Sequence, residues 1–164
     1  MTPQYKDRAI SVIVNNRPDV LARIAGTFSA RGFNIESISA NITRNPAVTK
    51  IIITTLTTPD TIAKVIKQLN RLVDVLEARR LRRPDAVRRE MILARVPLTG
   101  ERRAALRELI DTRGGKIVNE EAGSAVLEFT GDTDELEEVL TRLEALGMED
   151  MSRTGVIALE RRKP

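Results

Sequence analysis

The strongest constraint on the fold of this chain is an order of secondary-structure patterns that occurs twice. In the first half the patterns are a strand, a helix, two strands, a helix and a strand, at residues 10–14, 20–28, 35–42, 50–56, 59–69 and 73–81. The strands are rich in β-branched residues, and the helices place apolar side chains at helical spacing. This order, β-α-β-β-α-β, is that of a split βαβ unit.

The second half repeats the order, with strand patterns at residues 91–96, 116–118, 125–129 and 156–159 and helix patterns at residues 102–112 and 133–146. Thr133 is the expected N-cap of the last helix. Between the halves, residues 82–89 are rich in arginine and contain a proline, which is typical of a linker. We therefore predict an α+β protein of two ferredoxin-like βαββαβ domains in tandem, at residues 1–81 and 90–164. In the first domain we expect both helices on one sheet face and the other face free to pair.

Two residue types that carry much enzyme chemistry are absent. The chain has no Cys and no His, which excludes zinc fingers, thiol nucleophiles, His-based triads and disulfides. Acidic groups at residues 120–121 and 132–135 suggest a cation site, but loop solvation and the first turn of a helix explain them better. No convergent pair of carboxylates is apparent, so we predict no catalytic residues and no metal site.

The charge pattern indicates a mixed surface. The chain has 27 basic and 23 acidic residues, a net charge of +4, and the signs are interspersed. Arginines cluster at residues 79–89, where we favour a solvated linker over a docking patch. An RNA-binding module of the same βαββαβ order would stack bases on aromatic residues, and the strands at residues 10–14 and 50–56 contain none. We expect no nucleic acid partner.

No segment has the pattern of a membrane protein. The first eight residues lack the apolar core of a signal peptide, and no apolar stretch approaches the length needed to cross a bilayer. We expect a soluble, cytoplasmic chain without a membrane partner.

The turn at residues 15–19 is the best candidate for a binding site. A strand that leads directly into a helix leaves the first helical amides without intrahelical partners, and these amides favour an anion such as a carboxylate. The side-chain amides of Asn16 and Asn34 are able to hold the polar end of an amino acid. Both are also common turn residues, so the residues alone leave a structural role open.

Resemblance to a known family favours the binding role. Asn16-x-Pro18-x-Val20-Leu21-x-Arg23, followed by Arg-Gly-Phe-Asn-Ile-Glu-Ser at residues 31–37, closely resembles the N-terminal ACT domain of the small, regulatory subunit of acetolactate synthase. The resemblance continues at residues 67–75, 89–93 and 153–159, and so covers nearly the whole chain in order.

The resemblance implies a regulatory protein without an active site. In this family the large subunit binds thiamine diphosphate, magnesium and FAD and condenses pyruvate, and the small subunit needs no cofactor. The small subunit raises large-subunit activity and commonly conveys feedback inhibition by valine or another branched-chain amino acid. A stand-alone ACT-type amino-acid-binding regulator is the alternative.

The resemblance also implies where the effector binds. ACT domains of this kind form homodimers side by side, with the effector at the interface. Carried over by motif, the site uses Asn16, Asp19 and Val20 at the turn, with Asn34 and Ile35 from the neighbouring subunit.

Two positions depart from the family pattern. The family has Asn-x-Pro-Gly, and this chain has Asp19 at the glycine, which adds bulk and a negative charge near the expected effector carboxylate. We therefore expect weak or absent inhibition by valine. The alternatives are that the Asp19 side chain points to solvent or binds the ammonium group of the effector. Lys50 stands where the family often has arginine, so no bidentate contact is expected there.

Overall fold

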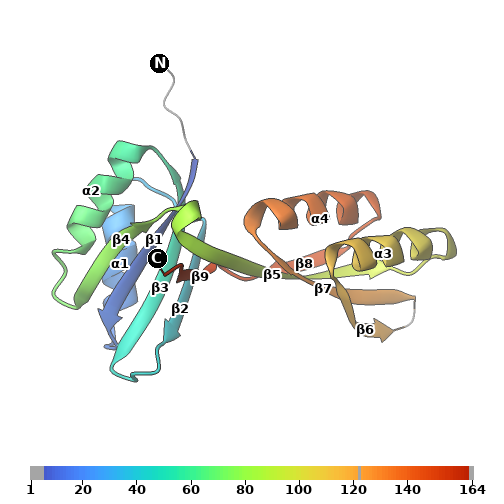
Figure 1. Ribbon diagram of the computed structural model, residues 1–164, viewed down its shortest axis with the longest axis horizontal. Coiled ribbons are helices and arrows are strands. Elements are labelled where there is room, and N and C mark those ends of the chain that lie inside the picture. Colours follow the sequence, from blue (N-terminus) through green and yellow to red (C-terminus); the bar gives the residue numbers. More distant parts are fainter. Residues whose placement is uncertain (1–5, 122, 163–164) are drawn as a thin grey trace, which may run out of the picture. The chain divides into compact units, whose positions relative to one another are not determined.

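The structure, a computed structural model, describes residues 6–121 and 123–162. The first five residues of the first predicted domain and the last two of the second therefore lie outside the described residues. The chain forms two compact units (Figure 1). Unit 1 comprises residues 1–87 together with residues 155–164, and unit 2 comprises residues 88–154.

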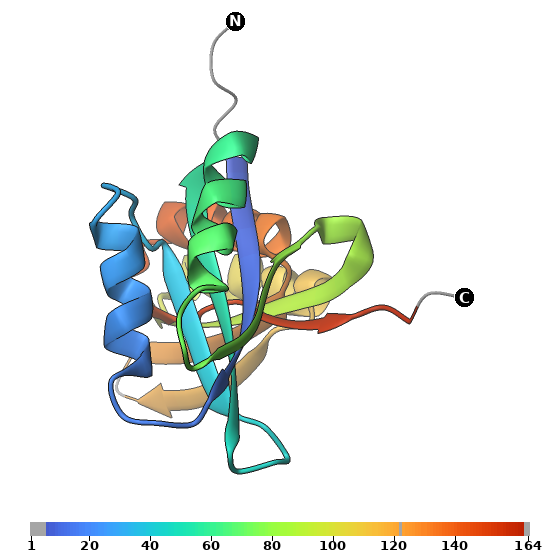
Figure 2. The ribbon, with the colours of Figure 1, turned by 90° about the vertical axis from the view of Figure 1, so that its left-hand side faces the viewer.

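Unit 1 has the predicted β-α-β-β-α-β order. Its elements are β1 (Lys6–Asn15), α1 (Val20–Ser29), β2 (Ser37–Ile42), β3 (Val48–Thr57), α2 (Pro59–Leu69) and β4 (Val75–Leu81). The sheet order is β2-β3-β1-β4, and every neighbouring pair is antiparallel. Both helices cover the same face of this sheet (Figure 2). The predicted ferredoxin-like fold of the first half is confirmed.

The core between helices and sheet follows from strand alternation. Alternate residues of β1 and β3 point to the helices, and they are β-branched, which suits a pleated buried surface. They pack against apolar residues of α1 and α2, and the buried cluster is Ile10, Val12, Val14, Val20, Ile24, Phe28, Ile51, Ile53, Ile62, Val65, Leu69 and Ala78.

Unit 2 repeats this architecture. It is built from β5 (Ala86–Pro97), α3 (Gly100–Arg113), β6 (Lys116–Glu121), β7 (Ser124–Gly131), α4 (Thr133–Ala145) and β8 (Asp150–Arg153). The strand order β6-β7-β5-β8 corresponds to that of unit 1. Its separate core is aliphatic apart from Phe129. The N-cap of α4 is Asp132, which forms a capping box with Glu135, and not the predicted Thr133.

Two predictions for residues after the first domain, a strand and the linker, differ from the structure. The last strand of unit 2 is β8, whereas the predicted strand at residues 156–159 is a separate strand, β9 (Ile157–Glu160), in unit 1. The sequence of β8, Asp-Met-Ser-Arg, has no run of apolar residues to mark a strand. The predicted linker at residues 82–89 is also structured, because a short 3₁₀ helix, η1 (Arg83–Asp85), leads directly into β5.

Residues 155–161, which we call the C-terminal strap, cover the outer face of the unit 1 sheet. Val156 is buried in a second cluster with Ala9, Ile52, Leu81 and Ala86, on the side away from the helices. β9 pairs with β5, whose first two residues belong to the same unit. The expectation of a free sheet face is therefore wrong: the chain returns to cover it.

Three polar contacts hold the strap in place. Lys50 Nζ donates to the carbonyl oxygen of Ala158 at 2.8 Å, and Arg79 forms an ion pair with Glu160 at 2.6 Å. The backbone N–H of Arg161 donates to the carbonyl oxygen of Asp85 at 2.9 Å. Lys50, which departs from the family pattern, thus serves the strap.

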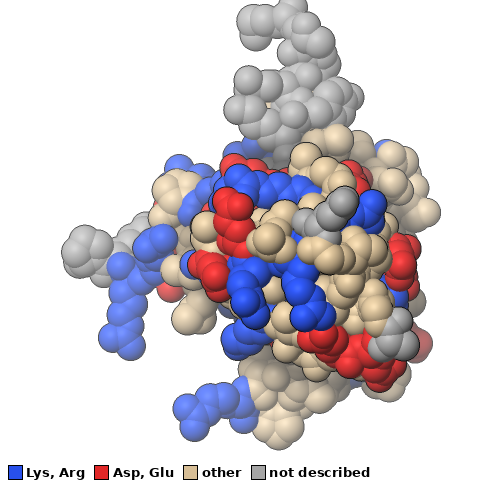
Figure 3. Space-filling view, turned by 90° about the vertical axis from the view of Figure 1, so that its right-hand side faces the viewer, with Lys and Arg blue, Asp and Glu red and all other residues tan. Residues whose placement is uncertain are grey.

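The surface carries charges of both signs. Figure 3 shows Lys and Arg side chains interspersed with Asp and Glu over the face it presents. In unit 2, Arg103 pairs with Glu120 at 2.9 Å and Arg113 with Glu138 at 2.5 Å. Among the described residues, no helix is long and apolar enough to span a membrane.

Candidate functional site

The turn between β1 and α1 is anchored to the hairpin loop that joins β2 and β3. The backbone N–H of Asn16 donates to the carbonyl oxygen of Ala47 at 2.8 Å. Its side-chain Nδ2 donates to the carbonyl oxygen of Pro46 at 2.9 Å, and its Oδ1 accepts from Thr49 Oγ1 at 3.2 Å. Asn16 therefore fixes the turn, and much of its hydrogen-bonding capacity is used within the chain.

Asp19 precedes the first residue of α1 and has an unusual backbone. Its φ of 67° and ψ of −7° are left-handed, and it is the one non-glycine residue with positive φ in the described part of the chain. Glycine adopts this conformation without strain, so the backbone here is the one that the family's glycine would take. The Asp19 side chain is exposed and makes no capping hydrogen bond, which leaves the first amides of α1 uncapped.

The other predicted site residues divide between the two ends of α1. Val20 is 4% exposed and its side chain packs in the core, so its backbone N–H is the group that it can offer to a ligand. Asn34 and Ile35 lie beyond the far end of the helix. The carbonyl oxygen of Asn34 accepts from Thr55 Oγ1 at 2.7 Å, and Ile35 packs against the core. A ten-residue helix is about 15 Å long. The structure thus does not bring the two groups together within one chain.

A buried carboxylate beside the turn was not predicted. Asp74, in the loop before β4, is 5% exposed and forms an ion pair with Arg23 of α1. Its Oδ1 lies 3.7 Å from Arg17 Nη1 and accepts no hydrogen bond from the described residues. Its carbonyl oxygen accepts from the N–H of Asn15 at 2.9 Å. One signal for this contact was present in the sequence: Arg23 is a charged residue within the helix pattern at residues 20–28 that does not occupy one of its apolar positions.

The described residues at this site offer hydrogen-bond donors and charged groups. Uncapped amides at the start of α1 lie beside Arg17, Arg23 and Asp74, which is an arrangement for binding a small zwitterion or anion. In the described part of the chain, no group of three or more His, Cys, Asp or Glu is placed to hold a metal ion.

Comparison with known families accounts for both units. The family described as "AHAS small subunit-like ACT domain" matches residues 10–77. The family described as "Small subunit of acetolactate synthase" matches residues 89–162. A probable acetolactate synthase small subunit from Archaeoglobus fulgidus is 34% identical over 152 residues, which cover 93% of this chain and 95% of the relative.

The chain belongs to the acetolactate synthase small-subunit family. The resemblance that the turn motif indicated is confirmed, and unit 1 carries the ACT domain.

Other acetolactate synthase small subunits agree with this assignment. The chloroplastic small subunit 2 of Arabidopsis thaliana is 35% identical over 160 residues, and the chain spans 33% of its length. The crystal structure of the small subunit from Thermotoga maritima superimposes with a TM-score of 0.86 at 28% identity, covering 97% of this chain and 99% of that one.

Proposed function

We propose that this chain is the regulatory subunit of an acetolactate synthase in branched-chain amino acid biosynthesis. It binds the catalytic large subunit and raises its activity, and it performs no reaction itself. The observation that carries this proposal is that two families of acetolactate synthase small-subunit domains match the two halves of the chain, in order. A stand-alone ACT regulator would not account for the match over residues 89–162.

We further propose that two copies pair through β2. This strand is at an edge of the unit 1 sheet, and it exposes Ile38 and Ile42 together with an unpaired backbone edge. The strap covers the outer face, so face-to-face packing of two sheets is disfavoured. Edge-to-edge pairing about a two-fold axis would continue the sheet from one copy into the other.

This pairing would complete the effector site. The β1–α1 turn lies at the end of β2, because Asn16 bonds the loop after that strand. Asn34 and Ile35 lie just before the start of β2. In an antiparallel β2–β2 pair, the start of one strand lies beside the end of the other. Asn34 and Ile35 of one copy would therefore approach Asn16 and Asp19 of its partner, as the family resemblance implies.

Within this site, we propose that the effector is a branched-chain amino acid that binds weakly. Its carboxylate would lie at the uncapped amides of α1, next to Asp19. Two like charges about 4 Å apart at an effective dielectric of about 20 repel by roughly 4 kcal/mol, and solvent reduces this at an exposed position. Valine inhibition is thus expected to be weak or absent.

Reconstitution with the cognate large subunit tests the regulatory role. Acetolactate formation is measured with the large subunit alone, with this chain added, and with a heat-denatured sample of the chain as control. We expect stimulation by the folded chain only, and then little response to valine, leucine or isoleucine. A large subunit whose rate is unchanged by this chain would contradict the proposal.

A further inference from the structure

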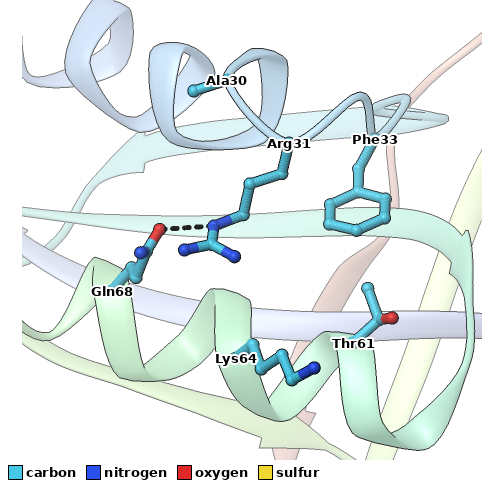
Figure 4. Close-up of a pocket in the computed structure, with 6 residues that line it drawn as sticks. All are labelled: Ala30, Arg31, Phe33, Thr61, Lys64 and Gln68. Atoms are coloured by element: carbon cyan, nitrogen blue, oxygen red, sulfur yellow. Dashed lines mark hydrogen bonds between the residues drawn. The ribbon is translucent and has the colours of Figure 1, made fainter.

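A groove of about 570 Å³ lies between the end of α1 and the side of α2 in unit 1. It is lined by Ala30, Arg31, Phe33, Thr61, Lys64 and Gln68. Figure 4 shows the Arg31 guanidinium reaching from the end of α1 toward Gln68 of α2. The Phe33 ring is on the same side as Arg31, and the Lys64 and Thr61 side chains are on the opposite side, on α2. The groove thus combines two cations, one hydroxyl and one aromatic face.

The positive charge of this groove is not compensated by its lining. None of the six residues is acidic, and Lys64 makes no hydrogen bond or ion pair with a described residue. Arg31 is held in place because its Nε donates to Gln68 Oε1 at 2.6 Å, which leaves its terminal nitrogens for another partner. A guanidinium that is fixed in this way loses less side-chain entropy when it binds a carboxylate.

The surface next to the groove allows close approach. The exposed side of α1 carries small residues, among them Ala22, Ala25, Gly26 and Ser29, and toward its start also Leu21 and Arg23. A Cβ atom built on Gly26 would have nothing within 4 Å, so the backbone of the helix is open there. A segment of a partner that lies along the C-terminal half of α1 would meet a surface of small side chains that ends at the two cations.

Two other surfaces of unit 1 are already assigned. The strap covers the outer sheet face, and the β2 edge is the one we assign to the second copy. Among the described residues, the helix layer exposes Lys67 of α2 and Arg71 after it, besides Arg31 and Lys64. Its exposed acids are Asp19, before α1, and Asp60 of α2. Its excess of positive charge suits an acidic partner.

We infer that the α1–α2 groove is a docking site for the catalytic large subunit, and that it receives an acidic side chain of that subunit between Arg31 and Lys64. The inference rests on the proposed function, since it requires that the two subunits associate. Its charge pairs form at a partly exposed surface, so they contribute chiefly to association rate and specificity and are weakened by salt.

The test compares Arg31→Glu/Lys64→Glu with the control Arg95→Glu/Arg107→Glu, which makes the same charge change on exposed residues of unit 2. Affinity for the cognate large subunit is measured at about 0.05 M and about 0.5 M salt. For the groove variant we expect the Kd to rise by about tenfold or more at low salt, with a weaker salt dependence than that of the wild type. Stimulation of acetolactate formation should fall in parallel, and the control should behave as the wild type.

Each other outcome has a separate meaning. Wild-type affinity in the groove variant would overturn the inference and leave the regulatory role intact. An equal loss in the control variant would also overturn it, since the effect would then be general electrostatic steering. A wild-type chain that does not bind the large subunit would refute the inference together with the proposed function. Circular dichroism and urea unfolding of both variants exclude loss of fold as the cause.

Discussion

One residue combines an unusual backbone with a charge at the start of α1. Asp19 occupies a left-handed backbone that costs most residues about 1–2 kcal/mol and costs aspartate less. The chain therefore retains the geometry suited to glycine and adds a carboxylate to it. Since the side chain makes no capping contact, its main effect is expected on ligands and not on the fold.

Removal of this charge is expected to restore effector binding. Asp19→Asn keeps the side-chain size and should tighten valine binding by about tenfold or more, and Asp19→Gly by at least as much. The free energy of unfolding should change by less than about 1 kcal/mol in Asp19→Gly, because relief of the left-handed backbone is offset by a more flexible unfolded chain.

Calorimetric titration with valine and urea unfolding measure the two quantities. Asp60→Asn, which removes an acid from the first turn of α2, is the control. Micromolar binding of valine by the wild type, or an unchanged affinity in Asp19→Asn, would contradict the account.

At the scale of elements, the sequence predicted those elements whose signals are local. Runs such as Ile51-Ile52-Ile53 located the central strands, and Gly32, with φ of 67°, ended the α1 segment as expected. Asp74 was missed because its burial arises from tertiary contacts with Arg23 that no spacing reveals. The residues alone indicated the turn as a candidate site, and the resemblance supplied the full set of site residues. The structure shows that these residues lie at the two ends of α1.

The strap illustrates the same limit. Val156 and its neighbours read correctly as a strand, but their position depends on contacts with residues far away in sequence, such as Ala9 and Ile52. The arginines at residues 79–89 were predicted to be a solvated linker because only their neighbours in the sequence were considered. In the structure, Arg88 is 8% exposed and Arg79 pairs with Glu160.

Gly155 sets how closely the strap approaches the sheet. A Cβ atom at this position would lie 2.8 Å from the carbonyl oxygen of Ile38, and backbone atoms cannot move aside cheaply. Gly155→Val should therefore lift the strap and expose Val156, which would reduce the free energy of unfolding by about 2 kcal/mol.

Urea unfolding and hydrogen exchange of β2 and β3 amides provide the measurement. Gly100→Ala is the control, because a Cβ atom there meets nothing within 4 Å. If Gly155→Val is as stable as the wild type, the close approach of the strap to the sheet does not contribute to the stability of unit 1.

At the scale of the whole molecule, unit 2 is an insertion within unit 1. The chain leaves unit 1 after Val87 and returns at Gly155, so the strap is distant in sequence from the sheet that it covers. The predicted boundaries, residues 1–81 and 90–164, assign the strap to the second domain and differ from this division. Each unit has its own buried core, which is the condition for independent folding.

The insertion makes a prediction for separated fragments. Residues 88–154 should fold cooperatively alone, since their core is complete. Residues 1–87 should be less stable than unit 1 of the intact chain, because Ala9, Ile52 and Leu81 lose the cover of Val156. A synthetic peptide of residues 155–164 added to that fragment should raise its midpoint of urea unfolding in proportion to the logarithm of peptide concentration above the Kd. The same peptide with Val156→Asp should not. Equal midpoints with the two peptides would show that the strap lies on unit 1 without stabilising it.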